Sequence, residues 1–322
     1  MVQRERPSVL SLILLLGAFA FGTACGPAGS NSMDGGWDAP PPRDVRPIEV
    51  TPPPPGPLGC RGVDILFLVD NSPSMRPKQQ RLAEAFPRFV DAMFQQLPQG
   101  TDLHVGITTT SFYVGDTGEG FQACRTTATP DYIQSRYMTP LMMNTGENGG
   151  QGRLFRYDNR NFFSTNTTTG DRDALRQWFT AAATGVGEES SSVECSSAGI
   201  GYAAHASNAS TNAGFIRDQG SVLVIIALTD EPDKSPEAAS VYHDLIVESK
   251  RGCGGDRCVI TAGIVPPCMR EVNDPLWRFL NSFGREPTYG DIEGTSEQYT
   301  QVVGDALARL IRDTCASIPP PP

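Results

Sequence analysis

Two long apolar runs, each followed at once by acidic or hydroxyl side chains, constrain the fold of this chain more than any other feature. The first run covers residues 63–69 and leads into Asp70. The second covers residues 221–228 and leads into Thr229 and Asp230. Both are rich in Val, Ile and Leu and are bounded by turn-forming residues, a pattern that predicts buried β-strands. We therefore expect two buried strands whose carboxyl ends carry oxygen-bearing side chains.

The rest of the folded region alternates between helical and extended patterns. Apolar positions recur every three or four residues in 77–97, which contains Pro87, and in 296–315, and this spacing predicts amphipathic helices. The other expected elements are strands at 102–111 and 259–265 and helices at 171–183, 194–208, 236–250 and 274–284. The alternation predicts an α/β fold with a doubly wound, mostly parallel central sheet flanked by helices on both faces. Such folds bind ligands beyond the carboxyl ends of their strands, so Asp70 and Asp230 should meet at one edge.

Residues 1–24 have the composition of an export signal. Arg4 and Arg6 precede an apolar stretch, residues 9–21, that is too short to span a bilayer comfortably. The small residues before Cys25 resemble a bacterial lipoprotein signal, in which Cys25 would become the lipidated N-terminus. By the same resemblance, the glycine after this cysteine favours the outer membrane. Simple secretion with cleavage nearby is the alternative.

The remainder of the chain divides into a tether and one domain. Residues 25–59 are rich in Pro and Gly, with proline runs at 40–42 and 52–55, and predict an extended tether. Residues 60–318 are enough for one large domain. Within this domain, the segment from about residue 112 to about residue 170 is rich in Gly, Asn and Thr and lacks a sustained periodicity of apolar residues. We therefore expect a long insertion there.

The cysteine content agrees with an exported protein. Besides Cys25, cysteines occur at positions 60, 124, 195, 253, 258, 268 and 315. In an oxidising compartment they should form disulfides, and their odd number leaves one thiol unpaired or paired outside the chain. We expect Cys60 to pair with Cys315, because these two bracket the folded region and would join its ends.

Charge and histidine content exclude several functions. The chain has 36 acidic and 26 basic side chains, a net charge of −10, and no basic cluster that could follow a phosphate backbone, so nucleic acid is not an expected partner. With only three histidines, zinc is a poor choice of metal. A Ser–His–Asp hydrolase is the enzyme alternative, but no Gly-x-Ser-x-Gly motif occurs. We therefore do not expect an enzyme.

The sequence Asp70-x-Ser72-x-Ser74 is the candidate for a cation site. It brings one carboxylate and two hydroxyls together where the first buried strand ends. These are hard oxygen ligands, which suit Mg²⁺ and suit zinc poorly. The alternative is a turn that caps the following helix, where the same residue types are common.

With these residues, the chain resembles the von Willebrand factor A domain family from about residue 60 to about residue 317. Asp70-x-Ser72-x-Ser74 and the later Thr229-Asp230 match two of the three loops of that family's metal-ion-dependent adhesion site. The resemblance implies that Ser72 and Ser74 bind the metal directly and that Asp70 and Asp230 lie close behind. It also implies an open coordination position that an Asp or Glu of a protein partner fills.

The third loop, which corresponds to residues 185–194, departs from the family. A threonine is expected there, and the chain offers Thr184 before the loop and Glu188 within it. We expect Glu188 to complete the site, because a carboxylate can replace a hydroxyl as an oxygen ligand.

The expected function is that of an envelope lipoprotein that binds a protein partner through Mg²⁺, with Mn²⁺ or Ca²⁺ as alternatives. The partner would present an acidic residue to the ion, and the protein would contact the membrane only through its lipid. The alternative is a structural envelope component whose metal site has lapsed, since Glu188 could cap the ion permanently.

Overall fold

The computed structural model describes residues 60–114, 142–188 and 193–318. The predicted signal peptide, lipidation site and tether lie outside these residues. Within the described ranges, no helix has both the length and the apolar content needed to cross a membrane.

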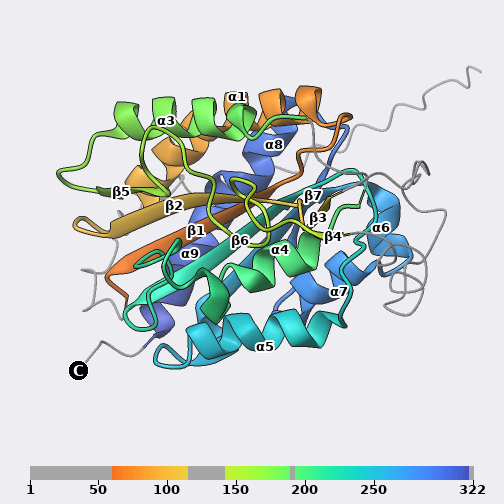
Figure 1. Cartoon of the computed structure of the whole chain (residues 1–322). Helices are drawn as coiled ribbons and strands as arrows, with labels where there is room; N and C mark the ends of the chain where they lie inside the picture. Colours follow the sequence, from red (N-terminus) through yellow and green to blue (C-terminus); the bar gives the residue numbers. More distant parts are fainter. Residues whose placement is uncertain (1–59, 115–141, 189–192, 319–322) are drawn as a thin grey trace, which may run out of the picture. The chain divides into compact units, whose positions relative to one another are not determined.

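A six-stranded sheet with the order β5-β2-β1-β6-β7-β8 forms the centre of the domain (Figure 1). Its strands are β1 (Gly62–Val69), β2 (Asp102–Thr109), β5 (Phe162–Asn166), β6 (Ser221–Leu228), β7 (Val259–Val265) and β8 (Thr288–Asp291). All neighbours are parallel except β5, which runs antiparallel to β2. The fold is therefore the doubly wound, mostly parallel α/β fold predicted from the sequence.

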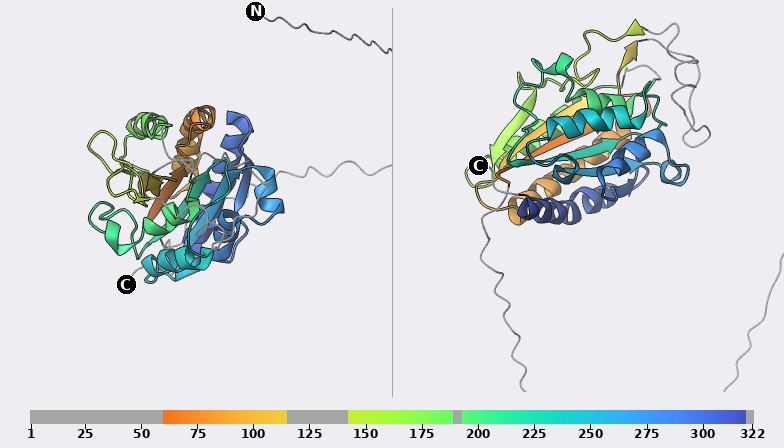
Figure 2. Two further views of the ribbon diagram at one scale, coloured as in Figure 1. Left: turned by 45° about the vertical axis from the view of Figure 1, so that its right-hand side comes forward. Right: turned by 90° about the horizontal axis from the view of Figure 1, so that it is seen from below.

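Helices cover both faces of this sheet, as Figures 1 and 2 show. One face packs against α1 (Arg76–Gln96), α3 (Arg172–Gly185), α8 (Ser296–Val303) and α9 (Asp305–Ser317). The other packs against α4 (Ser196–Tyr202), α5 (Ala239–Ser249), α6 (Pro267–Glu271) and α7 (Pro275–Leu280). Shorter elements are the 3₁₀ turns η1 (Ala206–Asn208), η2 (Gly255–Cys258) and η3 (Asn281–Phe283) and the pair β3 (Tyr113–Val114) and β4 (Met142–Met143).

Burial of strands β1 and β6 holds the centre of the sheet in place. Every residue of both strands is buried. On one face, Phe67 of β1 contacts Phe86 and Phe89 of α1 and Phe179 of α3, with ring centroids 5.8, 6.3 and 4.5 Å away. Because aromatic rings bury large areas and pack in defined geometries, this cluster fixes α1 and α3 against the strand that leads to the candidate site.

Several elements differ from the sequence-based predictions. Strands β5 and β8 were not predicted, because they are short edge strands without a long apolar run. The predicted helix at 194–208 is only seven residues long, as α4, and is followed by η1. The predicted helix at 296–315 is two helices, since Gly304 has φ −91° and ψ −125° and interrupts the helical backbone between α8 and α9.

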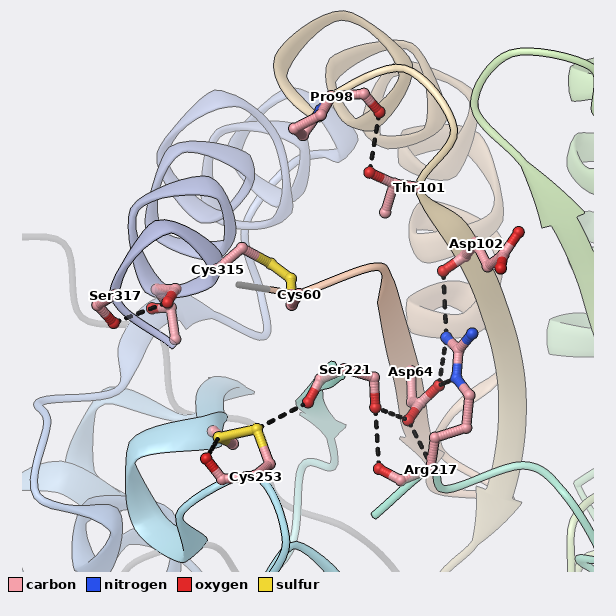
Figure 3. The surroundings of a disulfide bond; sticks show 12 residues. Cys60, Asp64, Pro98, Thr101, Asp102, Arg217, Ser221, Cys253, Cys315 and Ser317 are labelled. Carbon is pink, nitrogen blue, oxygen red and sulfur yellow. Dashed lines mark hydrogen bonds and ion pairs between the residues drawn. A yellow bond between two sulfur atoms is a disulfide. The ribbon is translucent and has the colours of Figure 1, made fainter. Parts of the chain in front are cut away.

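A disulfide joins Cys60, just before β1, to Cys315 in α9, as the sequence predicted (Figure 3). A second joins Cys253 to Cys258, and Cys268 is disulfide-bonded as well. Cys195 is a free, buried thiol. The Cys60–Cys315 bond ties the two ends of the domain together at the end of the sheet opposite the candidate site.

Candidate cation site at the strand ends

The turn after β1 is folded back on itself by the side chain of Asp70. The backbone N–H of Ser72 donates to Asp70 Oδ1 at 2.8 Å, and the backbone N–H of Asp70 donates to the carbonyl of Leu228 at 2.9 Å. Asp side chains commonly stabilise turns through such a bond to the residue two positions on. The turn directs Ser72 and Ser74 to the edge of the sheet just before α1 begins.

The loop after β6 meets this turn. Val69 and Leu228 are aligned as the last partners of the parallel strands β1 and β6, so the residues that follow them leave the sheet side by side. Ser74 Oγ donates to Asp230 Oδ1 at 3.1 Å, and the Oγ atoms of Ser72 and Ser74 are 3.3 Å apart. We call Asp70, Ser72, Ser74 and Asp230 the rim cluster.

Asp70 is the electrostatically strained member of the rim cluster. Burial and then the neighbouring charge of Asp230 raise its pKa to about 6, although hydrogen bonds from Thr229 and Ser72 act in the opposite direction. The hydroxyl of Thr229 donates to Asp70 Oδ2 at 2.7 Å. A buried carboxylate beside a second carboxylate is stabilised by a nearby cation, so the rim cluster favours positive charge.

One cation is supplied by the chain itself. Lys78 Nζ lies 2.9 Å from Asp230 Oδ2 and 3.3 Å from an oxygen of Glu293. Burial disfavours the charge of Lys78, but these two carboxylates outweigh it and raise its pKa. Sequence analysis missed this residue, although its position four residues after Ser74 at the start of α1 was a usable signal.

The residues expected from the third loop have other partners. Glu188 forms an ion pair with Arg76, whose side chain is largely exposed. The Thr184 hydroxyl donates to the carbonyl of Thr180 within α3 at 3.0 Å. The loop itself lies close to the site, because Gln79 Nε2 donates both to the Asp70 carbonyl at 2.9 Å and to the Gly187 carbonyl at 3.0 Å.

Sequence analysis also missed a buried ion pair beside the rim cluster. Lys234 Nζ contacts Oε2 of Glu194 and, at 2.6 Å, Oε2 of Glu231. Burial disfavours the charge of Lys234, but the two carboxylates raise its pKa, so we place the shared proton on the amine. Burial, opposed by Lys234, raises the pKa of Glu194, and Asp70 is among the charges that add to this shift.

The donor set of the rim cluster fits a hard cation. Two hydroxyls and two carboxylates converge from loops that are remote in sequence, and such oxygen ligands suit Mg²⁺, Mn²⁺ or Ca²⁺. Neighbouring oxygens in an octahedral Mg²⁺ shell are about 3 Å apart, which follows from a metal–oxygen distance of about 2.1 Å. The separations of 3.1 and 3.3 Å are compatible with that spacing. In the part of the chain that the structure describes, no three His, Cys, Asp or Glu side chains form a metal-binding group, so the hydroxyls are essential to the fit.

Comparison with known proteins gives similarities to solved structures only. No protein-family model and no curated protein matches the chain. Similar structures include proximal thread matrix protein 1 from the mussel byssus (13% identity over 81% of this chain and 50% of that one, TM-score 0.39). A von Willebrand factor type A protein from Catenulispora acidiphila is 13% identical over 79% of this chain and 43% of that one, with a TM-score of 0.36. The pilus adhesin SpaC from Lactobacillus rhamnosus GG is 12% identical over 78% of this chain and 31% of that one, with a TM-score of 0.41. This chain spans half or less of each of these proteins.

Proposed function

We propose that this chain binds a protein partner through a divalent cation held by the rim cluster, without chemical turnover. The observation that carries the proposal is the 3.1 Å hydrogen bond between Ser74 and Asp230, two residues that are 156 positions apart. It supports the convergence of the Asp70-x-Ser72-x-Ser74 turn with the loop after β6. Mg²⁺ is the preferred ion, with Mn²⁺ or Ca²⁺ as alternatives.

The partner would present an Asp or Glu side chain. A dication held partly by neutral hydroxyls keeps much of its positive charge, so it attracts an external carboxylate into an open coordination position. Ser72 and Ser74 would be the neutral ligands in this arrangement. The net charge of −10 argues against nucleic acid as the partner.

We also propose that the domain works at the cell envelope. Cys25 would carry the lipid, residues 25–59 would hold the domain away from the bilayer, and the outer membrane is the favoured location. Covalent lipid contributes about 0.8 kcal/mol per buried CH₂, so several acyl chains would anchor the protein firmly. Replacing Cys25 with Ser should abolish fatty-acid labelling and release the protein from membranes; labelling that persists in Cys25→Ser would contradict the anchor.

The cation can be tested directly by calorimetric titration of the full chain with Mn²⁺ and Mg²⁺. Ser74→Ala should weaken binding on the order of tenfold or more, because it removes one ligand. Ser164→Ala is the matched control, since Ser164 is exposed on edge strand β5, and it should leave binding unchanged. Capture of an envelope protein should then require the cation, be reversed by EDTA and fail with Ser74→Ala. A wild-type protein that binds neither ion would overturn the proposal.

A metal-independent structural role is the second candidate. The contact between Lys78 and Asp230 favours it, because an internal ammonium already balances one carboxylate of the rim cluster. In that case partner capture would persist in EDTA and would be insensitive to Ser74→Ala.

A further inference from the structure

Three buried side-chain oxygens lie close together in the chain without a hydrogen-bond partner among the described residues. They are Oε1 of Glu194 and the hydroxyls of Ser196 and Ser197. All three residues are at most 1% exposed. Buried polar atoms nearly always have a partner, so an orphaned one calls for an explanation, and an ion or a water that completes it is one such explanation.

The backbone carries Glu194 to the same edge of the sheet as the rim cluster. Glu194 forms an isolated antiparallel bridge with Ser111, just beyond the end of β2, and the adjacent Cys195 N–H donates to the Thr110 carbonyl at 3.0 Å. The Thr110 hydroxyl in turn donates to Asp70 Oδ1 at 3.3 Å. One residue, Thr110, therefore connects the loop of Glu194 to the carboxylate of Asp70.

Lys234 fixes the orientation of the Glu194 carboxylate. Its ammonium holds Oε2, and its backbone N–H donates to the Glu194 carbonyl at 2.8 Å. Both side chains are fully buried. One carboxylate oxygen is thus held by an internal cation, while the other, Oε1, has no hydrogen-bond partner among the described residues.

We infer that Glu194 supplies the third-loop ligand of the cation through Oε1, and that Lys234 is its positioning residue. The inference rests on the proposed function and replaces Glu188, whose carboxylate is paired with Arg76, in the role expected from the sequence. The ammonium of Lys234 is shared between Glu194 and Glu231, so it offsets part of the negative charge that Glu194 would bring to the ion. The ion therefore keeps more of its attraction for an acidic residue of a partner than it would beside an uncompensated carboxylate.

The test is Mn²⁺ binding by the full chain, measured by calorimetry and by the electron paramagnetic resonance spectrum of the bound ion. Glu194→Gln keeps an amide oxygen for Lys234 but turns a non-ligating NH₂ toward the position of Oε1. It should weaken Mn²⁺ binding at least about tenfold and change the spectrum of any bound ion. Glu188→Gln is the matched control and should bind Mn²⁺ as the wild type does.

Thermal unfolding in EDTA separates loss of the ligand from loss of the fold. If Glu194→Gln is unfolded, the double variant Glu194→Gln/Lys234→Met removes the buried charge together with the ligand, and it should show the same loss of Mn²⁺ binding. Two results would overturn the inference while the wild-type protein still binds Mn²⁺. One is a folded Glu194 variant with unchanged Mn²⁺ affinity, and the other is a Glu188→Gln variant with reduced Mn²⁺ affinity. Either result would leave the proposed function standing. A wild-type protein that does not bind Mn²⁺ or Mg²⁺ would overturn the proposed function itself.

Discussion

Lys78 and Asp230 form an ion pair between α1 and the loop after β6, with Nζ 2.9 Å from Oδ2. Their side chains are only 12% and 14% exposed, so solvent screens the pair less than it would at the surface. Lys78 also donates to the Ser74 carbonyl at 3.2 Å. A divalent cation at the rim cluster would therefore compete with Lys78 for the negative charge of Asp230.

Removing this competitor should strengthen cation binding. We expect Lys78→Met to raise the affinity for Mg²⁺ about tenfold, which corresponds to about 1.4 kcal/mol, because one nearby positive charge is lost. Lys78→Arg keeps the charge and should bind Mg²⁺ with nearly wild-type affinity. Calorimetric titration of the three proteins checks both expectations, and equal affinities for Lys78→Met and wild type would contradict them.

The Cys60–Cys315 disulfide should contribute much more to stability than the Cys253–Cys258 disulfide. The two bonds close loops with sequence separations of 255 and 5 residues. Loop-closure entropy then predicts losses of about 5 and about 2 kcal/mol when each pair is replaced by serines, less any strain in the native bonds. Urea unfolding of the two double-serine variants measures the difference, and equal midpoints would rule out this account.

Burial of Asp274 should make stability depend on pH. Its pKa is raised to about 7, first by burial and then by the charge of Asp233, while its Oδ1 accepts the N–H of Leu276 at the start of α7. Because the folded state binds the proton more tightly, the contribution of Asp274 is fully present below about pH 4 and is lost as the pH rises through about 7.

Asp274→Asn is neutral at every pH and can still cap α7. It should therefore be more stable than wild type at about pH 8 and should show a weaker decline in unfolding free energy between about pH 5 and about pH 8. Asp171→Asn, at the exposed N-cap of α3, is the control and should keep the wild-type slope. An Asp274→Asn slope equal to that of wild type would refute the assignment.

Helices α4 and α5 approach closely at a glycine. A Cβ added at Gly201 would lie 2.6 Å from Cβ of Tyr242, a fully buried residue of α5. Gly201→Ala should therefore destabilise the domain by about 1–3 kcal/mol through overpacking. Gly146→Ala is the control, because nothing lies within 4 Å of its added Cβ. Thermal unfolding of the two variants measures the difference. A Gly201→Ala variant as stable as Gly146→Ala would contradict the prediction, because it would mean that α4 and α5 accommodate the methyl group at little energetic cost.

The central strands were predictable because their signal is local. Strands β1 and β6 are unbroken apolar runs, and a run that is buried on both faces needs no information from distant residues to be recognised. The edge strand β5 has intermediate or exposed residues at four of its five positions, so its composition does not mark it as a strand. It is a strand because its backbone pairs with β2. Its assignment therefore required the tertiary structure.

The sequence alone determined the fold class, the turn at Asp70 and the residues of the rim cluster, since strand burial and turn chemistry depend on neighbours along the chain. Only the tertiary structure decided which third-loop carboxylate turns inward. Glu188 and Glu194 are six positions apart and equally acidic in sequence, yet one meets Arg76 near solvent and the other meets Lys234 in the interior. A buried charge is tolerated only where a partner compensates for its lost hydration, and Lys234 comes from a loop 40 residues further along the chain.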